Sequence, residues 1–252
     1  MPQLEECSGI QYLRDSVYDR DTIKQMKRPA IAQVETFKEY PDVPKVELPR
    51  SWELAEARIT PLFQNRRSLR KYIMKPIKLE ELAFMLWASQ GITAKSDNYS
   101  FRTTPSGGAL YPVETYLSAN LVEDLSPGIY HFDPRNFCLD QISNDDSAKD
   151  VAACCLDQKF MADSAVTFIW SGVLRRCLSK YGNRGMRYVF LDAGHVCQNL
   201  LVAAEATGNG GCPVAAFYDG EMNNLLGLDA AEETVIYAAA VGKKTSTKQC
   251  SL

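Results

Sequence analysis

The sequence predicts a globular protein in which helices and strands are interleaved along the chain. Hydrophobic residues make up 46% of the 252 residues and charged residues 23%, which is typical of an ordinary folded domain. Apolar residues recur at helical spacing in some segments and form short continuous runs in others, as helices and buried strands require. A chain of this length buries enough surface to fold without a disulfide or metal staple. Disorder and small disulfide scaffolds are therefore excluded.

Residues 1–58 are expected to form an N-terminal arm ahead of one domain, residues 59–252. The arm is rich in charges and prolines and shows little sustained periodicity. Its acidic beginning lacks the basic and apolar stretches of a secretion signal, so we expect a cytoplasmic protein. No apolar run approaches the roughly 20 residues that cross a bilayer, so no membrane segment is expected.

The first strong element of the domain is a helix over residues 79–91, LEELAFMLWASQG. Its leucines recur at three- and four-residue spacings, acids occupy its first turn and a glycine ends it. Residues 102–113 are dense in glycine, proline, serine and threonine, which predicts a loop. The loop leads directly into ETYLSANLVE, whose β-prone residues predict a strand.

The second half of the chain alternates strands with a long helix. A Pro-Gly pair followed by IYHFD predicts a hairpin from residue 126, and residues 164–173, SAVTFIWSGV, predict a buried strand. Residues 188–207 carry apolar side chains on most turns and stop at a glycine, as a long, mostly buried helix does. Residues 233–242, ETVIYAAAVG, predict the last buried strand.

Charge and composition exclude several classes of partner. The 28 basic and 31 acidic residues leave a net charge of -3, without the basic footprint of a nucleic-acid-binding protein. The eight cysteines show no CxxC spacing and there are only two histidines, so no metal site is expected. Neither GxGxxG nor GxxxxGK[ST] occurs, which excludes a Rossmann dinucleotide fingerprint and a P-loop.

Two motifs carry residues suited to binding a ligand. In NRRSLRKY, residues 65–72, arginines around Ser68 can converge on a phosphate if the stretch is turn or helix. A solvated basic face is the alternative, which charge pattern alone favours. In TPSGGALYP, residues 104–112, adjacent glycines let the backbone approach a flat or anionic ligand, and the alternative is a plain structural loop.

These motifs occur in one order with PGIYHFDP, KYGNRGMRYVFLDAGHVCQNLLVAA, CPVAAFYDGEMNNLLGLD and AVGKK, over residues 60–244. With this set of motifs the chain resembles the nitroreductase superfamily of FMN-dependent oxidoreductases. Within that superfamily it resembles the branch of azoline dehydrogenases that act in peptide maturation. The resemblance implies an α+β fold with a mostly antiparallel central sheet flanked by helices. It further implies a homodimer with FMN bound at the subunit interface.

The resemblance also assigns the FMN contacts. The phosphate and ribityl chain would be held by Arg66, Arg67, Ser68, Arg70 and Lys243. The isoalloxazine ring would lie against Pro105, Ser106, Gly107 and Gly108, with the backbone of Ala215 and Ala216 near its reactive edge. Classical members carry an amide side chain at Ala109 and an acid at Ala215, so this chain departs from the classical nitroaromatic-reducing pattern at both positions.

Lys180 and Tyr181 match the adjacent lysine and tyrosine that act in catalysis in the azoline branch. Dehydrogenation of a ring needs a base for the Cα proton while hydride leaves to flavin N5, and a surface turn is the alternative for this pair. The function implied is hydride transfer between NADH, NADPH or an organic substrate and an acceptor such as a quinone or nitro compound. Azoline dehydrogenation and a non-catalytic flavin carrier are the alternatives.

Overall fold

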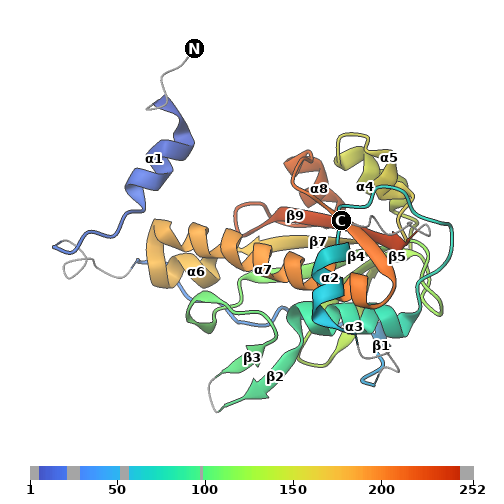
Figure 1. The fold of residues 1–252 in the computed structure, drawn as a ribbon. Helices are drawn as coiled ribbons and strands as arrows, with labels where there is room; N and C mark the ends of the chain where they lie inside the picture. The colour runs from blue at the N-terminus through green and yellow to red at the C-terminus, as the bar shows by residue number, and fades with distance from the viewer. Residues whose placement is uncertain (1–5, 22–28, 52–56, 97–98, 245–252) are drawn as a thin grey trace.

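The computed structural model describes residues 6–21, 29–51, 57–96 and 99–244 and is built around one seven-stranded sheet (Figure 1). The strand order is β1-β6-β5-β4-β7-β9-β8, and every ladder is antiparallel. The strands are β1 (Lys45–Glu47), β4 (Val113–Ala119), β5 (Gly128–Asp133), β6 (Cys138–Ser143), β7 (Val166–Val173), β8 (Asn209–Val214) and β9 (Glu233–Lys243). The predicted α+β fold with an antiparallel central sheet is confirmed.

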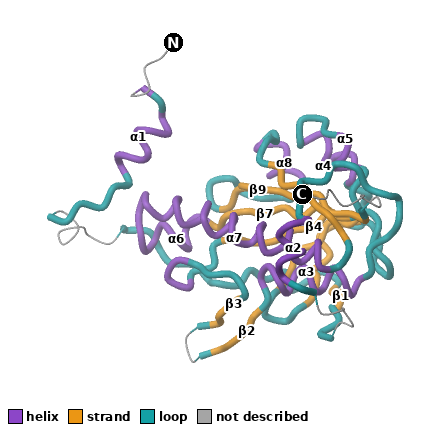
Figure 2. Tube along the Cα trace, in the orientation of Figure 1, coloured by secondary structure: helices purple, strands orange, loops and turns teal. Residues whose placement is uncertain are grey.

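Helices cover both faces of this sheet, and a small separate ribbon follows helix α3 (Leu79–Gln90) (Figure 2). The helices are α1 (Ser8–Asp15), α2 (Ile59–Asn65), α3 (Leu79–Gln90), α4 (Ala148–Cys154), α5 (Lys159–Ala162), α6 (Leu174–Tyr181), α7 (Gly185–Ala206) and α8 (Asp219–Leu225), with single 3-10 turns at η3 (Gly107–Ala109) and η4 (Gly182–Arg184). The ribbon pairs β2 (Ile92–Lys95) with β3 (Ser100–Arg102). Within the described residues, no helix is long and apolar enough to span a membrane.

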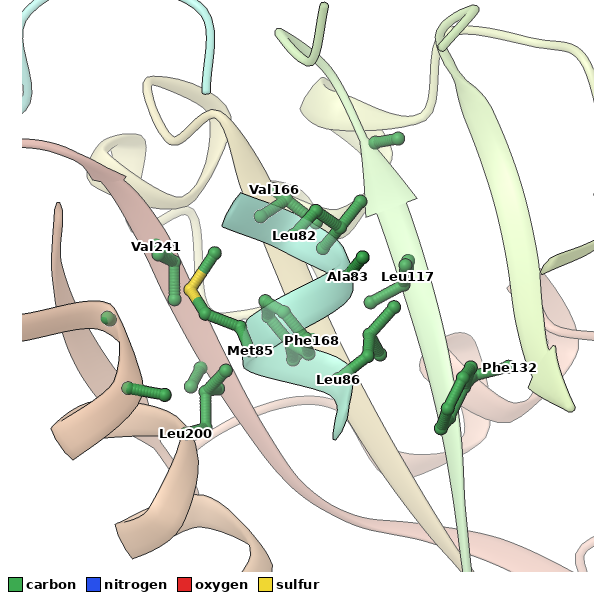
Figure 3. Packing of buried hydrophobic residues seen from close by; sticks show 14 of the residues in the cluster. Leu82, Ala83, Met85, Leu86, Leu117, Phe132, Val166, Phe168, Leu200 and Val241 are labelled. Carbon is green, nitrogen blue, oxygen red and sulfur yellow. The ribbon is translucent and has the colours of Figure 1, made fainter. Parts of the chain in front are cut away.

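The sheet separates two hydrophobic cores. On one face α3 and α7 pack against it, so that Leu86 and Leu200 meet Phe168 of β7 (Figure 3). On the other face α4, α5 and α8 enclose a second core that includes Ile169 and Met222. Successive strand residues point to opposite faces, so β7 carries apolar residues on both faces, because both are buried.

The predicted long elements are confirmed, with small shifts at their ends. The long helix, predicted from residue 188, begins at Gly185, which lies against the backbone of α6: a Cβ there would come 2.8 Å from the carbonyl carbon of Cys177. The short helices α4 and α8 span fewer than three turns each, so they give too few repeats for periodicity to reveal.

Both edges of the main sheet are short or interrupted by proline. β8, at one edge, contains Pro213, and the Gly211 carbonyl accepts the amide of Leu69, at 3.0 Å, from a neighbouring loop. β1, at the other edge, is three residues long and lies between Pro44 and Pro49. Proline lacks the amide that a ladder needs, and short edges resist further pairing.

Part of the N-terminal arm belongs to the main sheet. β1 pairs with β6, and the Lys38 ammonium, ahead of it, donates to Glu233 at 2.6 Å and to the Tyr116 hydroxyl at 2.7 Å. α1 extends away from the body beside α6 (Figure 1). Residues 52–56, which precede the expected boundary at residue 58, lie outside the described residues.

Candidate functional site

The basic segment Arg66–Arg70 runs as a loop with neither helix nor turn, so its arginines do not share a helix face. The amide of Leu69 fastens the loop to β8, and the Ser68 side chain hydrogen-bonds the thiol of Cys212 in the same strand. Tyr72 then forms a bridge with Lys244, just after β9. The loop therefore lies across the end of the sheet where β8 begins and β9 ends.

The arginines of this loop are not neutralised by acids. Arg67 and Arg70 are exposed and Arg66 is half-buried; among the described residues, none of the three forms an ion pair. Arg67 donates instead to the carbonyls of Gln64, at 3.0 Å, and of Arg66, at 2.8 Å. Guanidinium groups without acidic partners are suited to bind an anion such as a phosphate.

Lys243 lies at the same end of the sheet. It closes β9, and its carbonyl accepts the amide of Ile73 at 3.1 Å. Its ammonium lies 2.6 and 2.7 Å from the two carboxylate oxygens of Glu81 in α3. An ammonium has three N–H groups, so this ion pair leaves Lys243 able to donate to a further anion.

The glycine-rich loop adopts a backbone that side chains disfavour. Gly108, Ala109 and Tyr111 have φ of 70°, 56° and 43°, all in the left-handed region. Such conformations persist only where surrounding contacts fix them. Ser106 supplies two: its hydroxyl donates to Asp192 of α7 at 2.6 Å and accepts the Tyr111 amide at 2.9 Å. Pro105 ahead of it is exposed.

Lys180 and Tyr181, in the last turn of α6, lie directly against Gly108. A Cβ at Gly108 would come 2.4 Å from the Tyr181 hydroxyl and 2.8 Å from the Lys180 ammonium nitrogen. The Tyr181 ring makes an edge contact with Tyr188 of α7, at 4.8 Å between centroids, and Gly107 also lies close to Tyr188. The structure thus brings the lysine–tyrosine pair and the two glycines together.

The basic loop and the glycine loop contact different stretches of α7. Ser106 bonds to Asp192, whereas the Cys197 thiol is within electrostatic reach of Arg66. Five residues of helix separate these contacts by about 8 Å along the axis. Ala215 and Ala216 form a third group: they are exposed after β8, where the Ala216 carbonyl accepts the Gln158 amide at 3.5 Å.

A buried set of charges behind the glycine loop was not expected from the sequence. Glu114 of β4 accepts from Arg176 of α6 at 2.5 Å and lies 3.0 Å from one nitrogen of His131; the other ring nitrogen is 3.1 Å from Asp140. The buried Arg102 also interacts electrostatically with Glu114. The available signal was an acid within a buried strand, since such a charge requires partners.

Two pKa values show how these charges depend on one another. Burial raises the pKa of Glu114, but the charges of Arg176, His131 and Arg102 outweigh it and lower the pKa to about 2. Burial lowers the pKa of His131, but its hydrogen bonds to Asp140 and Glu114 outweigh it and raise the pKa. The two carboxylates therefore favour the protonated form of the imidazole.

The two loops differ in what they offer a ligand. Around Arg66–Arg70 the structure provides cations and a hydroxyl, which fit a phosphate monoester. At Gly107–Gly108 the absence of side chains lets Tyr188, Tyr181 and Lys180 lie against the loop backbone. No group of three or more histidine, cysteine, aspartate or glutamate side chains suited to a metal occurs in the described part of the chain.

Comparison with known proteins bears on this arrangement. The model of the nitroreductase family matches residues 63–243. MJ1384 of Methanocaldococcus jannaschii, which is named as a nitroreductase, is 32% identical over 203 residues, 81% of this chain and 98% of its own. The microcin B17-processing protein McbC of Escherichia coli is 25% identical over 133 residues, 51% of this chain and 49% of its own.

Solved structures show the same fold. A protein of Anabaena variabilis described as a nitroreductase superposes with a TM-score of 0.75 at 24% identity, over 92% of this chain and 45% of the other. The Escherichia coli microcin synthetase McbBCD complex superposes with a TM-score of 0.63 at 16% identity, over 95% of this chain and 92% of the other. The NADPH:FMN oxidoreductase of Vibrio harveyi superposes with a TM-score of 0.55 at 16% identity, over 75% of this chain and 69% of the other.

Proposed function

The chain belongs to the nitroreductase family, and we propose that it is an FMN-dependent oxidoreductase whose flavin phosphate binds to Arg66–Arg70. The observation that carries the proposal is the set of arginines in this loop, which no described acid neutralises, beside Lys243 at the end of β9. FMN, when bound, would accept and donate hydride at N5. Arg66, Arg67, Ser68 and Arg70 would hold the phosphate and ribityl chain, and Gly107–Gly108 would contact the ring.

We further propose a homodimer with FMN at the interface. α7 exposes Phe190 and Leu191, at 53% and 58%, and α2, which packs on α7, exposes Ile59 and Phe63. Neighbouring large apolar side chains that face solvent are typical of an interface between subunits. A dimer also provides a way for the basic loop and the glycine loop, which lie at different stretches of α7, to serve one flavin.

The visible spectrum of the purified protein, followed by anaerobic addition of NADH and then NADPH, tests the main proposal. We expect a bound flavin that is bleached by one of the two nicotinamides, followed by reoxidation with a quinone or a nitro compound. Protein that carries no flavin and cannot be reconstituted with FMN would refute the proposal. Bound flavin that no reductant or substrate bleaches would favour the non-catalytic carrier.

A second candidate function is dehydrogenation of azoline rings in a modified peptide. It is supported by the contact of Lys180 and Tyr181 with Gly108, and by the likeness to McbC, a microcin-processing protein. Tyr181 or Lys180 would take the Cα proton of a thiazoline or oxazoline while hydride passes to the flavin.

An azoline peptide incubated with the FMN-loaded protein should lose two hydrogens, measured by mass spectrometry. Lys180→Ala and Tyr181→Phe should each abolish the loss, whereas Lys149→Ala, an exposed lysine on α4, should not. Retained activity in both site variants would disprove their roles.

A further inference from the structure

We propose that Arg176 is a positioning residue, which fixes the glycine loop to α6 and thereby sets Lys180 and Tyr181 against Gly108. The inference rests on the proposed function for its significance, because it concerns the loop assigned to the flavin ring. It begins from an arginine with 3% of its side chain exposed, in a helix whose next turn carries Lys180. Residues four apart lie on one side of a helix.

Arg176 holds three separate segments with one guanidinium. Its Nη1 donates to the Tyr111 carbonyl, at 3.0 Å, and to the Glu114 carboxylate, at 2.5 Å, while its Nε donates to the Glu35 carbonyl of the arm, at 2.7 Å. The planar fork of an arginine presents several donors in fixed directions, which a lysine cannot do. Arg176 therefore connects the arm, β4 and the glycine loop to α6.

The Tyr111 carbonyl is the point at which this contact matters for the loop. Tyr111 is the last of the left-handed residues that begin at Gly108, and no glycine relieves the backbone there. Its amide is held from the other side by Ser106, which is itself bonded to Asp192 of α7. The strained loop is thus fixed between α6, through Arg176, and α7, through Asp192.

Glu114 in turn keeps Arg176 in place. The carboxylate receives Arg176 on one oxygen and faces His131 with the other. His131 contacts Asp140, which pairs with Lys45 near the surface. Lys45, Asp140, His131, Glu114 and Arg176 thus form one continuous chain of polar contacts, which restricts the positions open to the Arg176 side chain. An arginine held in this way fixes the position of α6 relative to the glycine loop, and with it the contact of Lys180 and Tyr181 with Gly108.

Backbone amide exchange, measured by mass spectrometry on the full chain without added FMN, tests the inference independently of flavin binding. Arg176→Lys keeps the charge opposite Glu114 but cannot span three acceptors. We expect exchange to increase about tenfold or more in residues 104–112 and 177–184, with α3 unaffected. The matched control is Arg175→Lys. Arg175 is next to Arg176 in the chain but pairs with Glu232 at the surface, so this variant should leave exchange in both segments unchanged.

Exchange in Arg176→Lys that equals wild type, or that increases throughout the chain, would overturn the inference. Should this variant fail to fold, Glu114→Gln, which removes the charge that orients Arg176, should give the same local increase; unchanged exchange would overturn it equally. FMN titration of the wild type reports separately on the proposed function. If the wild type binds FMN, Arg176→Lys should lower the affinity for FMN about tenfold or more and change the visible circular dichroism of the bound flavin.

Discussion

Two groups of arginines in this molecule have the same chemistry but different surroundings. Arg66, Arg67 and Arg70 lie in a loop at the end of the sheet, where none of them pairs with a described acid. Arg102 and Arg176 are buried behind the glycine loop, with Glu114 within electrostatic or ion-pair reach. An acidic partner distinguishes Arg176 from the loop arginines: Glu114 balances the charge of Arg176 inside the fold, whereas the loop arginines remain available to a ligand.

The largest effect that would test this difference is on stability. Arg176→Met should lower the free energy of unfolding by about 3–5 kcal/mol, because it removes the ion-pair partner from one oxygen of the buried Glu114 carboxylate. Arg66→Met should change it by less than about 0.5 kcal/mol. Urea unfolding followed by circular dichroism measures both. Equal losses in the two variants would mean that the two groups do not differ in the way described.

Acid should weaken the buried group, because the pKa values of Glu114 and of the connected Asp140 are both lowered in the folded protein. The pKa of Glu114 is lowered to about 2 in the folded protein. The ionised Glu114 contributes about 3 kcal/mol to the free energy of unfolding. This contribution is complete above the unfolded pKa of 4.5 and is lost as the pH falls toward 2. The raised pKa of His131 acts oppositely: its contribution is complete below 6.5 and is lost as the pH rises through the folded value.

Stability against urea should therefore be greatest between about pH 4.5 and 6.5 and decline on both sides. Glu114→Gln should flatten the acid side of the curve, since it removes the titrating group. An acid side that remains equally steep in Glu114→Gln would assign the loss to other carboxylates.

The exposed group should show its effect on binding instead. Arg70→Ala should raise the dissociation constant for FMN about tenfold to a hundredfold, the effect of losing a hydrogen bond to a charged group. Flavin fluorescence titration measures it, and the urea midpoint should not change. An unchanged affinity would remove Arg70 from the phosphate site.

The smallest effect is expected for a surface arginine that has an acid partner. Arg135 pairs with Glu39, with 39% and 59% of the side chains exposed. Arg135→Ala should cost at most about 1 kcal/mol, because solvent screens the pair. It should leave FMN affinity as in the wild type, which makes it the control for Arg70→Ala. A loss of affinity here would show that surface charge in general, and not the basic loop, attracts the ligand.

Contiguous features of the sequence predicted the fold well and supply the candidate site residues, whose roles stay a prediction, whereas scattered features were missed. α3 and α7 are long and periodic, β7 is a mostly apolar run, and each ligand motif lies in one short stretch of chain. The buried network could not be found in this way, because Glu114, His131 and Asp140 meet only when β4, β5 and β6 pair side by side. β8 was missed for a related reason: NGGCPV reads as a turn, and its pairing with β9 makes it a strand.

The blunted edges of the main sheet have a consequence for how copies of the chain can associate. At β8, Pro213 has no amide to offer and the Gly211 carbonyl is already taken by Leu69; at β1, three residues between prolines provide almost no ladder. Both edges therefore disfavour continuation of the sheet by a strand of a second molecule, which is also the route to fibrils. In the proposed dimer, the contacts would therefore be made by helices, where side-chain shape determines which surfaces fit.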